Sequence, residues 1–292
     1  LIGGSADLGP SNNTTLKNKG EYLNASSAGS NIHFGVREHA MGNIMNGICL
    51  HGGLNPYAGT FLVFSDYMKP AIRLAALQNL PVKLVFTHDS IGLGEDGPTH
   101  QPVEHLASLR AIPRLDVYRP ADANETIACW EQTFKRNNPS AIILTRQKIQ
   151  TIATKEQAKL GVSRGAYILV DHDDEPDIII LASGSEVEIA YNAQNVLEKK
   201  DIRARVVSMP SWEIFEEQDD AYKESILPKN IKERVAIEAG SSMGWHKYVL
   251  NDDNIIAMSD FGASGPAEDL FKHFGFSTEN LVKKILEIIE NN

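Results

Sequence analysis

The feature that most constrains the fold is a regular alternation of short apolar runs, rich in β-branched residues, with longer stretches of helical periodicity. Strands that alternate with helices predict parallel sheets whose faces are covered by helices. In the first half of the chain the expected strands are 31–34, 56–62, 82–87, 116–118 and 141–145. The expected helices are 38–50, 66–80, 103–111 and 124–137.

A second cycle of strands and helices follows a polar stretch, residues 150–159 (QTIATKEQAK), which has little apolar periodicity and is interpreted as a linker. Strands are then expected at 177–181, 204–207, 235–238 and 255–258, and helices at 186–200, 219–227, 266–274 and 278–290. Ser277 is the expected N-cap of the last helix. The predicted fold class is α/β, with two consecutive α/β domains, each a mostly parallel sheet flanked by helices. The predicted divisions are 1–150, a linker over 151–172, and 173–292.

The composition excludes several classes of partner. A formal net charge of −10 and the lack of basic runs argue against nucleic acid or an anionic membrane surface. The two cysteines, Cys49 and Cys129, lack metal-site spacing and fit a reducing cytosol as small core residues. No apolar run approaches the length of a membrane span. We therefore expect a cytoplasmic protein.

Polar, glycine-rich segments of the first domain fall where predicted strands end. In open α/β sheets, ligands bind at the carboxyl ends of the strands. A binding site is therefore expected among five segments: 3–12 (GGSADLGPSN), 35–41 (GVREHAM), 59–67 (GTFLVFSDY), 87–102 (THDSIGLGEDGPTHQP) and 145–147 (TRQ).

Glu38 follows a predicted strand and opens a predicted helix. The simplest interpretation is a carboxylate that stabilises the helix N-terminus. The following helix is largely apolar, however, so its start is expected to be buried. Burial disfavours the charged form of a carboxyl group. Such a group can be protonated near neutral pH and donate a hydrogen bond to a ring nitrogen.

Two further features each have a structural and a functional interpretation. Phe61, Phe64 and Tyr67 share a spacing of three, which fits core packing or an aromatic wall on which a flat heterocycle stacks. Spacing alone does not decide between these. Arg146 follows a strongly apolar strand. It is either a surface arginine or a bidentate contact to a sugar phosphate.

Histidines and carboxylates concentrate between residues 88 and 105, which raises the question of a metal site. Only His100 and Glu104 have a clear helical interval, and Pro102 interrupts it. No metal is expected here.

The spacing from Asp96-Gly97 to Asn124 is similar to a GDG…N element, which binds magnesium and diphosphate. Pro98 stands where a helix should begin, and Glu95 replaces the first glycine. We therefore reject a diphosphate site at this position.

Taken together, the order and spacing of these segments resemble transketolase. The resemblance covers essentially the whole chain and continues through 118–124 (YRPADAN), 182–186 (ASGSE), 261–265 (FGASG) and 274–276 (FGF). REHA alone also resembles pyruvate dehydrogenase-type β subunits and deoxyxylulose-phosphate synthases. THDSIG with GEDGPTHQP is more specific, and favours transketolase or the closely similar dihydroxyacetone synthase.

The resemblance implies a pyrimidine-binding domain and a C-terminal domain, without the family's diphosphate-binding domain. It implies transfer of a two-carbon ketol unit from a ketose phosphate to an aldose phosphate, in the pentose phosphate pathway. The implied catalytic residue is Glu38, which hydrogen-bonds the aminopyrimidine ring of thiamine diphosphate. The implied cofactor contacts are Phe64, Phe61, Tyr67 and Asp7, and the implied substrate contacts are Ser11, His88, Asp96, His100 and Arg146.

Thiamine diphosphate would be held here by its pyrimidine end only, with Mg²⁺ and the diphosphate in the missing domain. The expected partners are sugar phosphates, that domain and a second copy in a homodimer. We expect a fragment that is inactive alone, or else the second member of a split enzyme. A non-catalytic binding module that kept the fold is a third hypothesis. The joint retention of six residues argues against it, namely Glu38, Phe64, His88, Asp96, His100 and Arg146.

Overall fold

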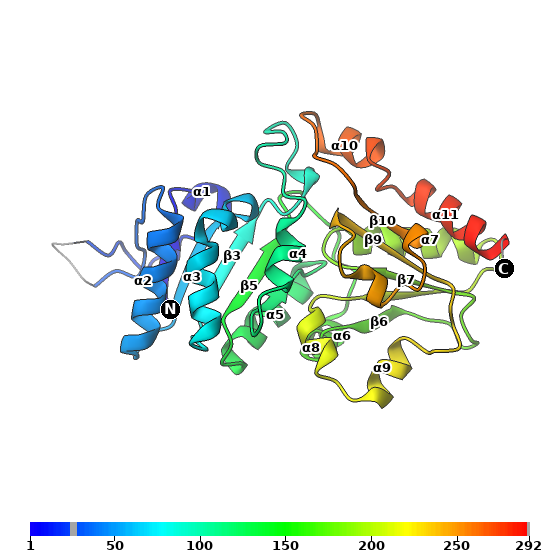
Figure 1. The fold of residues 1–292 in the computed structure, drawn as a ribbon, viewed down its shortest axis with the longest axis horizontal. Helices are drawn as coiled ribbons and strands as arrows, with labels where there is room; N and C mark the ends of the chain where they lie inside the picture. Colours follow the sequence, from blue (N-terminus) through cyan, green and yellow to red (C-terminus); the bar gives the residue numbers. More distant parts are fainter. Residues whose placement is uncertain (24–27, 291–292) are drawn as a thin grey trace.

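The structure is a computed structural model that describes residues 1–23 and 28–290. Two five-stranded sheets lie side by side along the long axis of the molecule (Figure 1). The first sheet has the order β1-β2-β3-β5-β4, and its neighbouring strands are all parallel. Its strands are β1 (Ile2–Ser5), β2 (Pro56–Phe61), β3 (Lys83–Thr87), β4 (Asp116–Tyr118) and β5 (Ser140–Leu144).

Two long helices of the first domain, α2 (Glu38–His51) and α3 (Ser65–Leu77), pack against each other beside this sheet. An added Cβ on Gly42 would lie 2.8 Å from the Cβ of Ala71, so a glycine at this position allows the close approach. Met41 and Met68 are fully buried between helices and sheet. The helices and turns of this domain are α1 (Gly9–Asn12), α2 (Glu38–His51), η1 (Leu62–Phe64), α3 (Ser65–Leu77), η2 (Ile91–Leu93), α4 (His105–Arg110) and α5 (Ala123–Lys135).

The second sheet has the order β10-β9-β7-β8-β6, with β6 antiparallel to β8 and the other neighbours parallel. Its strands are β6 (Tyr167–Val170), β7 (Ile178–Ala182), β8 (Ala204–Ser208), β9 (Arg234–Ser241) and β10 (Ile255–Met258). The remaining elements are α6 (Lys155–Arg164), α7 (Glu186–Glu198), α8 (Trp212–Glu216), α9 (Asp220–Ile226), η3 (Trp245–Lys247), η4 (Asp252–Asn254), α10 (Ala267–His273) and α11 (Thr278–Glu290). The expected α/β class, with two mostly parallel sheets flanked by helices, is confirmed.

Two expectations about local structure were wrong. Residues 31–34 form no strand, because Asn31 makes only isolated bridges and its side chain binds the backbone of Leu16 and Gly20. The supposed linker is largely structured. It contains α6, which Thr154 and Gln157 begin with a reciprocal capping box. It also contains β6, which pairs with β8 and so belongs to the second sheet.

One apolar cluster spans the two domains. Ile91 and Tyr118 of the first domain belong to the same buried cluster as Ile180 and Ile237 of the second. Cys129, on α5, is buried in this cluster, as expected for a small core residue. None of the helices in the described ranges is long and apolar enough to cross a membrane.

Candidate functional site

Four adjacent strands of the first sheet end at one edge, because they run parallel. Asp7 lies just beyond β1, Phe61 ends β2, His88 follows β3 directly, and Arg146 lies just beyond β5. These strands are consecutive in the sheet. The structure therefore gathers four sequence-predicted residues at the carboxyl edge, where ligands bind in sheets of this type.

A cleft of about 900 Å³ lies at this edge. Six of the predicted residues line it, and they come from the loop after β1, the start of α2, and the segments that follow β2 and β3. These are Asp7, Glu38, Phe61, Phe64, Tyr67 and His100. The other lining residues are Ala6, Leu8, Val36, Arg37, His39 and Ala40.

Glu38 is the first residue of α2 and is 7% exposed. The Thr60 hydroxyl donates to Glu38 Oε1 at 3.4 Å, which is the long end of the hydrogen-bonding range. The helix N-terminus favours negative charge at this position. Glu38 therefore opens a helix and also lines the cleft as a nearly buried carboxyl group.

The aromatic residues form a continuous series of flat rings. Phe61 and Phe64 are stacked, with ring centroids 5.8 Å apart and planes 9° apart. Tyr67 continues the series at 6.1 Å from Phe64, and His100 meets Phe64 edge-on at 5.5 Å. Phe61 is buried, whereas Tyr67 is 66% exposed. A surface of this kind can hold a planar heterocycle by stacking.

His88 packs behind this wall. Its ring lies on that of Phe61 with centroids 3.8 Å apart, and its Nδ1 lies 2.8 Å from the Thr87 hydroxyl. Burial lowers the pKa of His88, and the positive charge of Arg146 lowers it further, while Asp96 opposes the change. The imidazole is therefore neutral at neutral pH.

Two of the candidate residues have backbone conformations that are rare for non-glycine residues. Asp7 has a φ of 61° and His88 a φ of 58°. Both values lie in the left-handed region, where an L side chain is strained. Such strain persists where the surrounding structure fixes the conformation, and it is often found at functional sites.

The other predicted residues lie outside the cleft lining. Ser11 is exposed on α1. Asp96 and Arg146 are exposed, and both are near enough to His88 for their charges to affect it. Sequence reasoning missed Arg37 and His39, which line the cleft on either side of Glu38. The signal that could have identified them was their place in the GVREHAM segment.

The described residues contain one group of three side chains with possible metal-ligand atoms, namely Asp66, Glu104 and His105. Asp66 is already engaged, because the Lys69 ammonium lies 2.8 Å from Oδ1 and His105 Nε2 lies 3.0 Å from Oδ2. A lysine paired with the carboxylate competes with a cation for the same oxygens. Geometry therefore offers little support for a metal here.

The rejected diphosphate motif has a structural explanation. The amide of Asn124 donates to the Ala153 carbonyl at 2.8 Å, and Asp122 accepts from the backbone of Ile152 and Ala153. These side chains fix the segment between the domains. Asn124 is thus occupied by a structural contact.

Comparison with known proteins identifies both halves of the chain. A family model described as "Transketolase, pyrimidine binding domain" matches residues 1–151, and one described as "Transketolase-like TK C-terminal domain" matches residues 165–277. The transketolase of Aquifex aeolicus (strain VF5) is 55% identical over 289 residues. That match covers 98% of this chain and 42% of the relative.

Solved structures of transketolases have the same fold as this chain. The structure titled "Transketolase from Leishmania mexicana" superposes with a TM-score of 0.94 at 45% identity, covering 100% of this chain and 43% of that chain. This chain thus spans about two fifths of the length of these two relatives. A structure titled "Split gene transketolase, inactive beta4 tetramer" has the same fold over 99% of this chain and 92% of its own, with a TM-score of 0.79 at 23% identity.

Proposed function

This chain belongs to the transketolase family, and we propose that it supplies the pyrimidine-binding half of a thiamine-diphosphate active site. The observation that carries the proposal is a single cleft lined both by the nearly buried carboxyl group of Glu38 and by the stacked rings of Phe61 and Phe64. A flat, nitrogen-containing ring needs one hydrogen-bonding group at its edge and an apolar surface against its face. The described residues therefore fit the pyrimidine end of the cofactor.

When bound, thiamine diphosphate supplies a nucleophilic thiazolium carbon that breaks and forms carbon–carbon bonds next to a carbonyl group. Glu38 holds a proton at the pyrimidine ring nitrogen and thereby orients the ring. Phe64 and Tyr67 bind the ring by stacking, with Phe61 packed behind Phe64, and they keep water from one of its faces. Asp7 completes the cofactor side of the cleft.

The substrate side of the site is formed by His88, Asp96, His100 and Arg146, with Ser11 at its margin. Arg146 is exposed and permanently charged, and a guanidinium group binds phosphate oxygens through two parallel hydrogen bonds. Neutral His88 can donate and accept hydrogen bonds with sugar hydroxyls. These properties fit a sugar phosphate, so the proposed reaction is transfer of a two-carbon ketol unit from a ketose phosphate to an aldose phosphate, as in the pentose phosphate pathway.

A partner surface is also proposed at the rim of the cleft. Val36 is 76% exposed and Tyr67 is 66% exposed, although both line the cleft. Exposed apolar side chains around a binding site are typical of a surface that another domain covers. The proposed occupant is the family's diphosphate-binding domain with its Mg²⁺, brought by a second protomer in a homodimer.

Reconstitution tests this proposal. The chain is mixed with the diphosphate-binding domain of a transketolase, thiamine diphosphate and Mg²⁺, and transfer from a ketopentose phosphate to an aldopentose phosphate is followed. We expect transfer only when both protein components are present. If the two components associate and no transfer occurs, the proposed function is wrong.

A further inference from the structure

The loop between β3 and α4 is joined to the second domain. This loop, residues 88–101, is here called the 88–101 loop, and it carries the proposed substrate contacts His88, Asp96 and His100. Within it, Ile91 is fully buried in the core that the two domains share. Two sets of polar contacts, one near each end, join the loop to the second domain.

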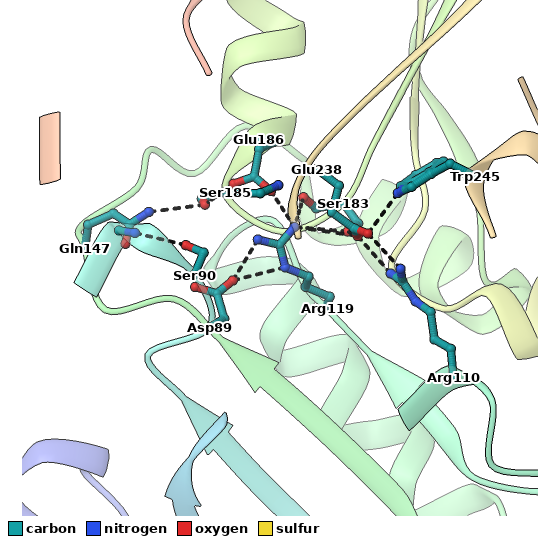
Figure 2. Close-up of polar contacts among 12 residues, drawn as sticks. Asp89, Ser90, Arg110, Arg119, Gln147, Ser183, Ser185, Glu186, Glu238 and Trp245 are labelled. Carbon is teal, nitrogen blue, oxygen red and sulfur yellow. Dashed lines mark hydrogen bonds and ion pairs between the residues drawn. The ribbon is translucent and has the colours of Figure 1, made fainter. Parts of the chain in front are cut away.

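The first set, called the arginine anchor, consists of Arg119, Asp89, Ser183, Glu186 and Glu238. Figure 2 shows Arg119 between Asp89 of the loop and the acidic residues of the second domain. Its Nε donates to Asp89 Oδ2 at 3.0 Å, and its Nη1 donates to the Ser183 carbonyl at 2.8 Å and to Glu186 Oε2 at 2.5 Å. The Arg119 side chain is 1% exposed. The residue next to His88 is thus tied to the second domain through one buried guanidinium group.

Glu238 closes this anchor on its far side (Figure 2). Its two oxygens accept from Arg110 at 2.8 and 2.9 Å, and Oε2 also accepts from Trp245 Nε1 at 2.8 Å. Burial alone would raise the pKa of Glu238, but Arg110 and Arg119 together hold it at about 2. Removing one member of a buried ionic network is costly, because it leaves another member as an unpaired buried charge.

The second set, called the glutamine anchor, consists of Gln101, Gly262, Ala263 and Ser264, with the loop carbonyls they contact. Gln101 is 2% exposed, and its Nε2 donates at 2.9 Å both to Gly94 of the loop and to Ala263 of the second domain. The Ser264 hydroxyl donates to the Glu95 carbonyl at 2.5 Å. An added Cβ on Gly262 would lie 1.8 Å from Gln101 Oε1, so a larger residue at this position would displace the Gln101 amide.

We propose that the second domain positions the 88–101 loop for substrate binding, with Arg119 and Gln101 as positioning residues. The inference rests on the proposed function and gives the second domain a part in it. The arginine anchor fixes the residue after His88, and the glutamine anchor fixes the carbonyl before Asp96 and the residue after His100. Neither anchor includes Glu38 or Phe64, so loosening an anchor should weaken sugar-phosphate binding more than cofactor binding.

Hydrogen exchange on the chain itself tests the anchoring directly. We expect Gln101→Ala and Ser264→Ala to speed amide exchange within 88–101, while exchange within β2 stays at the wild-type rate. Ser225→Ala is the matched control for Ser264→Ala. Like Ser264, Ser225 donates its hydroxyl to a backbone carbonyl, that of Tyr222 at 2.7 Å, but this bond lies within the second domain. Unchanged exchange of the loop in both test variants would overturn the proposal.

Steady-state kinetics on the reconstituted enzyme tests the functional consequence. Gln101→Ala and Arg119→Lys should raise KM for the ketose phosphate about tenfold, as expected for loosened hydrogen-bonding groups. The apparent affinity for thiamine diphosphate should stay within about twofold of wild type, and Ser225→Ala should match wild type in both. Unchanged KM, or an equal loss of cofactor affinity, would contradict the positioning role. Absence of activity in the wild-type mixture would instead refute the proposed function, while hydrogen exchange would still decide on the anchors.

Discussion

The imidazole ring of His88 lies on the phenyl ring of Phe61, with centroids 3.8 Å apart. These two residues mark the ends of neighbouring strands, β3 and β2. Phe61 is in turn stacked with Phe64. The proposed cofactor wall and the nearest proposed substrate contact are therefore packed as one unit, although they come from separate segments of the chain.

The aromatic wall leads to a prediction about cofactor affinity. Phe64→Ala should weaken thiamine diphosphate binding to the reconstituted enzyme about tenfold, because it removes one stacking contact. Titration calorimetry measures the change. Phe134→Ala is the matched control, since Phe134 is an exposed ring on α5 that also stacks on an aromatic neighbour, Trp130. Equal affinities in the two variants would show that Phe64 does not bind the cofactor.

A buried carboxyl group predicts how stability depends on pH. Burial raises the pKa of Glu213 from 4.5 to about 7. The folded chain therefore binds this proton more tightly than the unfolded chain. The contribution to the free energy of unfolding is complete below pH 4.5 and is lost as pH rises through 7. The shift of the Glu213 pKa from 4.5 to about 7 corresponds to about 3 kcal/mol in the free energy of unfolding.

Glu213→Gln removes that titration. The free energy of unfolding is measured by urea denaturation at pH 5 and pH 8. The difference between variant and wild type should shift in favour of the variant from pH 5 to pH 8, because only the wild type loses the contribution of Glu213. The Val117 amide, which donates to Glu213 Oε2 at 3.3 Å, keeps an oxygen acceptor in the variant. A variant that differs from wild type equally at both pH values would contradict the assignment.

The chain without the diphosphate-binding domain should bind thiamine diphosphate weakly and carry no metal. The chain offers the cofactor one stacking contact, on Phe64, and one hydrogen bond, to Glu38. Together these contribute about 2 to 3 kcal/mol to the binding free energy. Loss of translational and rotational freedom costs at least about 4 kcal/mol. Titration calorimetry with Mg²⁺ present checks this. Micromolar binding would mean that a diphosphate site exists in this chain, and Asn124 would be the first residue to test.

Most of the strands could be predicted from their apolar runs, although β1 and β6 were not. β4 and β10 have the predicted bounds, and α11 begins after Ser277, whose hydroxyl accepts from the Asn280 amide as an N-cap does. α6 was missed because few of its residues are buried. Its capping-box sequence, from Thr154 to Gln157, was nevertheless visible in the chain.

The sequence could place candidate residues at one cleft only in part. Phe61 ends β2 and Phe64 follows it, whereas Glu38 reaches the same cleft from the start of α2, which no strand directly precedes. The partners of Arg119 could not be predicted, because tertiary packing brings them together, Asp89 from the first domain and Glu238 from the second. A single arginine in the YRPADAN segment gives no sign of which carboxylates it binds.

The central claim is that Glu38 serves the cofactor as well as opening α2. Its most direct test is the rate of ketol transfer by the reconstituted enzyme carrying Glu38→Ala, with Glu131→Ala on α5 as the control that removes an exposed carboxylate. We predict a loss of at least about a hundredfold for Glu38→Ala, because the proton held at the cofactor ring is lost. The circular dichroism spectra of both variants should match that of wild type, and so should the activity of Glu131→Ala. Near-normal turnover in Glu38→Ala would show that Glu38 is only a helix-start carboxylate and would contradict the account.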